Sequence, residues 1–180
     1  MRKVIITIGL AVLVLAASVS QASVVFFDTA DPMVMPGETI SVTIFSTVIT
    51  TQIRMDRISD ADSGTASNLY LNPGYYEIIS EGTLVNTNGI LIEDVLTLAP
   101  PVPPEISGVL YSFDYTVPIA PFGHTITIFG DPSDEAINQI SCFVDNDYVR
   151  LTPESLTLTV IPEPTSIVLL GIGSLLLAKS

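Results

Sequence analysis

The clearest structural signal in the chain is the stretch Gly108-Val109-Leu110-Tyr111-Ser112-Phe113-Asp114-Tyr115-Thr116-Val117-Pro118. From Val109 to Val117, every second side chain is apolar or aromatic, and most of the side chains between them are polar. Successive side chains of a β-strand point to opposite faces of the sheet. This period of two therefore predicts a strand with one buried face and one face in water.

The same alternation recurs at residues 40–44, 126–128 and 156–160, and turn-forming sequences such as Asn72-Pro73-Gly74 separate the alternating runs. A helix of one or two turns fits only residues 133–139. Many short strands with regular turns predict an all-β fold, an antiparallel β-sandwich. The predicted core comprises Ile40, Val42, Ile44, Val109, Phe113, Ile126, Ile128, Leu156 and Leu158.

The order of these pieces resembles that of the cohesins and of related bacterial carbohydrate-binding sandwiches, which have an Ig-like architecture. The resemblance rests on residues 24–27, 35–42 and 108–118, followed by the strand at Ile126. It implies a non-catalytic binding module that docks a partner domain, such as a dockerin-like domain, or binds an extracellular polysaccharide. Fold analogy by itself does not choose between these ligands.

The first 22 residues have the three parts of a secretory signal peptide. Arg2 and Lys3 form a basic start, residues 4–17 form an apolar run, and Ser20-Gln21-Ala22 is a small-x-small cleavage site. We expect signal peptidase to cut between Ala22 and Ser23. The alternative is an uncleaved membrane anchor, for which the apolar run is short.

At the other end, Pro162-Glu163-Pro164 precedes an apolar run, residues 165–178, and Lys179 follows that run. Residues 162–180 resemble the PEP-CTERM sorting signal. The resemblance implies a short transmembrane-type helix that inserts transiently into the inner membrane, and processing near Pro162, Glu163 and Pro164 by an exosortase-type enzyme. It also implies a tethered precursor whose product reaches the cell envelope, the surface or the extracellular matrix. Gly171 and Gly173 disfavour the alternative, a buried C-terminal core helix.

Between these ends lies one domain, residues 23–161. From residue 23 to residue 164, 19 acidic side chains face only three basic ones, Arg54, Arg57 and Arg150, which gives a formal charge of −16. Such a surface repels phosphate backbones, so nucleic acid is excluded as a partner. It also repels anionic lipid. Cations and polyhydroxyl surfaces stay compatible with this charge.

The stretch 56–64 holds three carboxylates and ends in a glycine. Calcium takes several oxygen ligands from a flexible loop, and Asp60 and Asp62 could supply some of them, with Asp56 as a weaker candidate. No other cofactor is expected. Residues 145–147 form a second acidic turn. The alternative is that both stretches are solvated turns in which Asp and Asn cap their own backbone.

Three tyrosines, Tyr70, Tyr75 and Tyr76, flank the turn at residues 72–74. Flat aromatic rings beside a turn are typical of sugar-binding faces. The chain has no tryptophan, which argues against a strong glycan platform. The alternative is that these rings pack across strands in the core or at a sheet edge.

The chain offers few groups for catalysis. Cys142 is the only cysteine, so no internal disulfide can form, and its alternation with Ile140 and Val144 predicts a buried thiol. His124 is the only histidine, and no Gly-x-Ser-x-Gly motif accompanies it. We therefore expect no enzyme. Two classes stay open: a structural or adhesive component of the envelope or matrix, and a binding module with a defined ligand.

Overall fold

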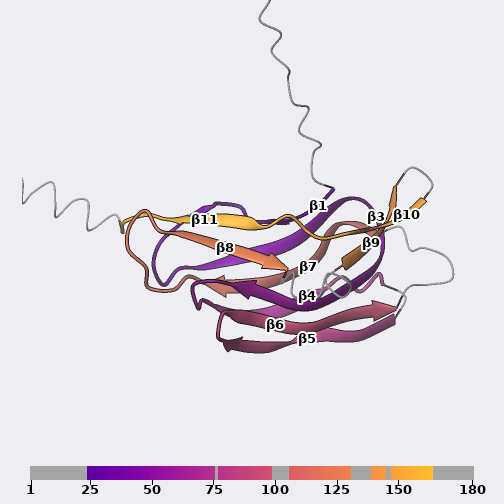
Figure 1. The fold of residues 1–180 in the computed structure, drawn as a ribbon, viewed down its shortest axis with the longest axis horizontal. Helices are drawn as coiled ribbons and strands as arrows, with labels where there is room; N and C mark the ends of the chain where they lie inside the picture. Colours follow the sequence, from indigo (N-terminus) through magenta and orange to yellow (C-terminus); the bar gives the residue numbers. More distant parts are fainter. Residues whose placement is uncertain (1–23, 76, 99–105, 131–138, 145–146, 164–180) are drawn as a thin grey trace, which may run out of the picture.

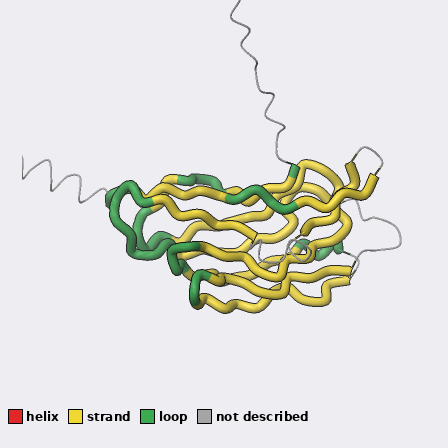
Figure 2. The backbone as a smooth tube through the Cα atoms, in the orientation of Figure 1, coloured by secondary structure: helices red, strands yellow, loops and turns green. Residues whose placement is uncertain are grey.

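The structure, a computed structural model, describes residues 24–75, 77–98, 106–130, 139–144 and 147–163. These residues form an all-β fold, as predicted (Figure 2). The strands are β1 (Val25–Asp28), β2 (Met33–Val34), β3 (Thr39–Asp60), β4 (Thr65–Leu71), β5 (Glu77–Thr87), β6 (Ile90–Leu98), β7 (Ile106–Thr116), β8 (Thr125–Gly130), β9 (Gln139–Val144), β10 (Asp147–Leu151) and β11 (Leu156–Val160).

The long strand β3 belongs to both layers of the sandwich (Figure 1). Its first half pairs with β1 on one side and with β7 on the other, and β7 also pairs with β4. The register shifts between Ser46 and Thr50. Beyond the shift, β3 pairs with β9 and β8 along one edge and with β6 along the other, and β6 pairs with β5. One strand therefore makes the first layer continuous with the second.

The segment around β11 joins the edges of the two layers. β11 pairs with β8 and, in parallel, with β2. Just before β11, the amide of Glu154 donates to the carbonyl of Val25, and the amide of Phe27 donates to the carbonyl of Glu154. These bonds satisfy backbone groups that would otherwise form an open edge between β1 and β8.

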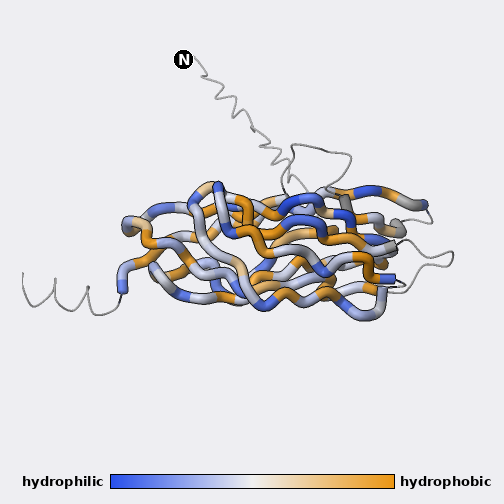
Figure 3. Tube along the Cα trace, turned by 90° about the horizontal axis from the view of Figure 1, so that it is seen from below, coloured by the Kyte–Doolittle hydropathy of each residue, from blue (hydrophilic) through white to orange (hydrophobic). Residues whose placement is uncertain are grey.

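The core lies between the two layers, and hydrophobic and hydrophilic residues alternate along the strands that enclose it (Figure 3). Six of the nine predicted core side chains are buried, and two more pack against the core while staying partly exposed. The buried ones are Val42, Ile44, Phe113, Ile126, Ile128 and Leu158, and the partly exposed ones are Ile40 and Leu156.

The prediction that Val109 belongs to the core is wrong, because its side chain is 39% exposed. Ile44 lies opposite Tyr111, and the next residue of β3, Phe45, lies opposite Val109, so Leu110 is an extra residue on β7. A bulge of this kind shifts the alternation by one position. Leu110 and Tyr111 are consequently both buried, and Val109 points outward.

The two predicted terminal signals lie almost wholly outside the described residues. The signal peptide, the cleavage site at Ala22 and Ser23, and the apolar run after Pro164 all belong to this part of the chain. Pro162 and Glu163 are described, and they follow β11 after Ile161. No described residue belongs to a helix of the length and apolarity that a membrane crossing needs. The short helix considered at residues 133–139 also lies outside the described residues, apart from Gln139, which begins β9.

Candidate functional site

The acidic turn after β3 buries its first carboxylate. Asp60 is buried, and its Oδ1 accepts a hydrogen bond of 3.0 Å from the amide of Ser63. Its Oδ2 accepts from the amide of Gly64 at 2.9 Å and from the hydroxyl of Tyr115 at 2.5 Å. Burial, with the Asp60 carboxylate beside it, raises the pKa of Tyr115. Asp60 therefore holds the turn closed and anchors a core tyrosine.

The second carboxylate of this turn has a different partner. Asp62 Oδ1 lies 2.6 Å from Nε2 of His124, which precedes β8. Asp56 lies on β3 beside Arg54 and Asp94, away from this turn. In the part of the chain that the structure describes, no group of three acidic, histidine or cysteine side chains could hold a metal ion. The calcium hypothesis for Asp60, Asp62 and Asp56 thus stays a prediction, and the geometry favours the alternative of a self-capped turn.

The three tyrosines do not form one aromatic platform. Tyr75 is buried, and its hydroxyl lies 3.0 Å from Oγ1 of Thr50, so core packing is the correct assignment for this ring. Burial also raises the pKa of Tyr75. Tyr70 is half exposed on β4. Tyr76 lies outside the described residues. Of the predicted sugar-binding residues that are described, only Tyr70 can meet a ligand.

Neither Cys142 nor His124 is placed for nucleophilic chemistry. Cys142 is fully buried beside Ile140, as predicted, and burial raises the pKa of its thiol to about 11. A thiol that holds its proton at neutral pH is a poor nucleophile. The His124 ring is hydrogen-bonded to Asp62, and among the described residues no serine or cysteine is hydrogen-bonded to either side chain.

The outer face of the first layer carries a groove that the sequence did not predict. Its volume is about 600 Å³. The lining comes from the end of β1 and the loop after it, the first half of β3, and β7. Phe45, Ile40 and Val109 form its apolar part, and the rings of Phe45 and Phe26 lie 5.6 Å apart. We call this depression, with its lining residues, the outer groove.

Three carboxylates, those of Asp28, Asp31 and Glu38, line the outer groove, and no basic side chain does. Asp31 Oδ1 accepts a hydrogen bond from the amide of Met33 at 2.8 Å, and Glu38 Oε2 accepts one from the amide of Met35 at 2.7 Å. Each of these two acids is thereby fixed in place by one oxygen. Among the described residues, nothing hydrogen-bonds the Asp28 carboxylate. The groove therefore combines an apolar floor with an uncompensated negative rim.

The outer face of the second layer has a different character. Arg57 Nε lies 3.1 Å from Oε1 of Glu93, and these residues face each other across β3 and β6. Arg54, Asp56, Asp94 and Leu96 line a depression of about 160 Å³ where β3 pairs with β6. The ion pair of Arg57 and Glu93 neutralises two of these charges within the chain, which leaves less net field for a partner.

Only one sequence signal pointed toward the outer groove. Phe45 follows Ile44 directly, so an aromatic side chain occupies a position that the period of two assigns to solvent. No sequence pattern predicts the acidic rim, because Asp28, Asp31 and Glu38 come close together only through the pairing of β1 with β3.

The fold is that of a cohesin-like β-sandwich. A type I cohesin of Clostridium thermocellum, solved in a cohesin–dockerin complex, is 16% identical with a TM-score of 0.50, and the match covers 77% of this chain and 100% of that one. A type I cohesin of Pseudobacteroides cellulosolvens is 13% identical with a TM-score of 0.48, covering 77% and 95% of the two chains.

A cohesin of Clostridium acetobutylicum is 16% identical with a TM-score of 0.49, covering 77% of this chain and 92% of that one. No protein-family model matches the sequence, and neither does any curated protein. At 16% identity, the match to the Clostridium thermocellum cohesin shows the fold alone and leaves the ligand open.

Proposed function

We propose that this protein is an exported, non-catalytic binding module that docks a partner protein on the outer groove. The observation that carries this proposal is the groove itself, an apolar floor bordered by three carboxylates without a basic neighbour. The cohesin-like fold supports it, since the Clostridium thermocellum cohesin was solved as a complex with a dockerin.

The charge of the outer groove sets the chemistry of the partner. Its three carboxylates attract a segment that carries lysine or arginine, and its apolar floor accepts the aliphatic or aromatic side chains beside them. The surplus of acidic residues over the whole domain adds a long-range attraction that raises the association rate. Lysine and arginine also have long apolar stems that pack on such a floor.

A peptide array tests this assignment. The purified full chain is probed against extended peptides that combine Lys or Arg with Leu or Phe, and against the same peptides with acetylated lysines or with citrulline in place of arginine. We expect binding only to the charged set. Asp28→Asn should weaken it, and the control Asp94→Asn, which removes one exposed carboxylate from the opposite face, should not. Equal binding by both variants would contradict the assignment of the outer groove as the docking site.

An extracellular polysaccharide is the second candidate ligand, and Tyr70 is the observation that favours it. Its half-exposed ring lies on β4 opposite Ser112 of β7, and Ser112 lies opposite Thr43 of β3. A ring with a row of hydroxyls beside it can stack on and hydrogen-bond a sugar. Retention of the chain on the producer's own exopolysaccharide, lost in Tyr70→Ala and kept in Asp28→Asn, would favour this ligand over a protein.

The ends of the chain provide its route to the cell surface in this proposal. Signal peptidase cuts after Ala22, and the tail inserts into the inner membrane until an exosortase-type enzyme processes it near Pro162, Glu163 and Pro164. N-terminal sequencing should find Ser23 as the first residue. Replacing the Pro-Glu-Pro tripeptide with three alanines should leave precursor in the inner membrane. Normal maturation of that variant would contradict the sorting step.

A further inference from the structure

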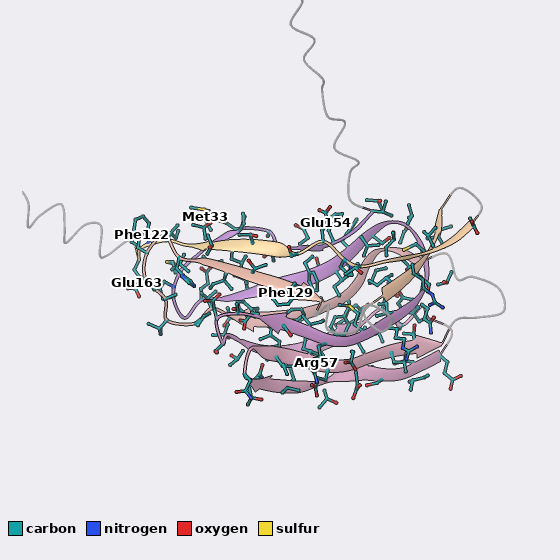
Figure 4. The ribbon with its side chains drawn as sticks, viewed as in Figure 1. Met33, Arg57, Phe122, Phe129, Glu154 and Glu163 are labelled. Atoms are coloured by element: carbon teal, nitrogen blue, oxygen red, sulfur yellow. The ribbon has the colours of Figure 1, made fainter. Side chains whose placement is uncertain are left out.

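One end of the sandwich exposes large apolar side chains. Ile119 and Phe122, in the loop between β7 and β8, are 87% and 72% exposed, and Met33 of β2 is 47% exposed. Figure 4 places Phe122 and Met33 at the same end of the molecule. We call these three residues the apolar tip. Exposed clusters of large apolar residues on a soluble domain mark contact with a partner or a membrane.

The apolar tip is attached to the point where the chain leaves the domain. The amide of Gly123 donates to the carbonyl of Val160 at 2.9 Å, and the amide of Val160 donates to the carbonyl of His124 at 2.9 Å. Thr159 lies opposite Met33 in the parallel pair of β11 and β2. Glu163, three residues after Val160, lies at this end in Figure 4. Backbone hydrogen bonds therefore fix the tip beside the chain exit.

The distance from this exit to the apolar run of the tail is short. Five residues, 162–166, separate Ile161 from Ile167, the first large apolar residue of the run 165–178. Six Cα-to-Cα steps join Ile161 to Ile167, and a fully extended chain spans at most about 3.6 Å per step, so the connection reaches no further than about 22 Å. Two prolines in this connection restrict it further. Whatever surface holds the tail must consequently lie close to the apolar tip.

We propose that the apolar tip inserts into the interfacial layer of the bilayer that holds the tail. This inference rests on the proposed membrane insertion of the tail. Phe and Ile side chains leave water favourably at the boundary between headgroups and acyl chains. The acidic residues nearby, among them Asp31 and Glu163, disfavour anionic lipid, so the matching surface is a zwitterionic one. While the tail holds the protein in the membrane, the apolar tip would face the bilayer, and the outer faces of both layers would stay accessible to a partner.

The absence of tryptophan from the chain allows a direct test. Phe122→Trp places a single tryptophan in the apolar tip of the full chain, and Tyr70→Trp places one at an exposed site on β4 as the matched control. Both variants are reconstituted with the tail into phosphatidylcholine vesicles, with and without lipids brominated on their acyl chains. Bromine quenches tryptophan only at short range. We expect severalfold stronger quenching for Phe122→Trp than for Tyr70→Trp.

Flotation of the vesicles on a density gradient separates the two proposals. Flotation with equal quenching of the two variants overturns the tip contact and leaves the tail insertion standing. A chain that stays at the bottom of the gradient overturns both. A blue-shifted emission of Phe122→Trp that grows with protein density, without bromine quenching, means that a second copy covers the tip and overturns the membrane contact. Ile119→Trp serves as a second probe if Phe122→Trp melts early in detergent.

Discussion

The two faces of strand β7 use the same backbone for different purposes. Inward, Tyr111, Phe113 and Tyr115 fill the core, and the two hydroxyls are bonded to the carbonyl of Glu81 at 2.8 Å and to the Asp60 carboxylate at 2.5 Å. Outward, Val109 and Ser112 lie on the exposed face with the outer groove. The inward hydroxyls are hydrogen-bonded within the chain, whereas the outer groove leaves carboxylates and apolar side chains accessible to a partner. Stability and binding can therefore be altered separately along one strand.

The largest effect is expected for the inward aromatic ring of Phe113. Phe113→Ala should lower the free energy of unfolding by about 3–5 kcal/mol, because it leaves a cavity in the core. Ser112→Ala, on the outward face next to it, should change stability by no more than about 0.5 kcal/mol. Chemical denaturation of both variants measures the contrast. Similar losses in both would mean that the two faces of β7 are not separable.

The acidic turn gives the next contrast. Asp60→Ala should cost about 2–3 kcal/mol, because it removes the acceptor of two amides and of the Tyr115 hydroxyl in a buried place. Asp62→Ala loses only a partly exposed contact with His124 and should cost less than about 1 kcal/mol. Thermal melting of the two variants at neutral pH compares the two losses of stability. A larger loss in Asp62→Ala would contradict the assignment of Asp60 as the structural member.

Alkaline pH should weaken the inward face. Burial raises the pKa of Tyr111, with the nearby Glu81 as a second cause, so the folded phenol keeps its proton after the unfolded one begins to lose it near pH 10.0. Unfolding then releases protons, and stability falls as the pH rises through and above this value. Tyr111→Phe should flatten the pH profile, recovering about 1 kcal/mol of the loss at pH 10.5. Parallel profiles for the variant and the natural chain would contradict the burial effect.

On the outward face, the expected effects on stability are small and those on binding are larger. Asp28→Asn should change the free energy of unfolding by no more than about 0.5 kcal/mol. The same change should weaken binding of a cationic peptide up to about fivefold, the value of one exposed ion pair. Added salt should narrow this difference, since it screens the lost charge. A salt-independent difference would point to altered shape in the outer groove.

Calcium should have the smallest effect. Asp60 and Asp62 are already bonded within the chain, so calcium should raise the melting temperature no more than magnesium does at equal ionic strength. A shift of several degrees specific to calcium, lost in Asp60→Ala, would restore the metal-site hypothesis.

The sequence by itself determined the all-β fold, most of the buried positions and the burial of Cys142. These features follow from the alternation of neighbouring side chains, which is a local property of a strand. The negative charge is equally local, since it is a sum over the residues. The predicted terminal signals also depend on sequence alone, and they stay predictions.

Only the tertiary structure decided where Val109, Asp60 and Tyr75 lie. Val109 points outward because β7 carries one extra residue opposite β3, and a bulge leaves no mark in the period of two. Asp60 is buried because Tyr115, far along the chain, donates to it. The outer groove has the same origin, since the pairing of β1 with β3 brings Asp28 to Phe45 and β7 adds Val109. Such contacts depend on which strands pair and in which register, and local side-chain patterns carry no information about that choice.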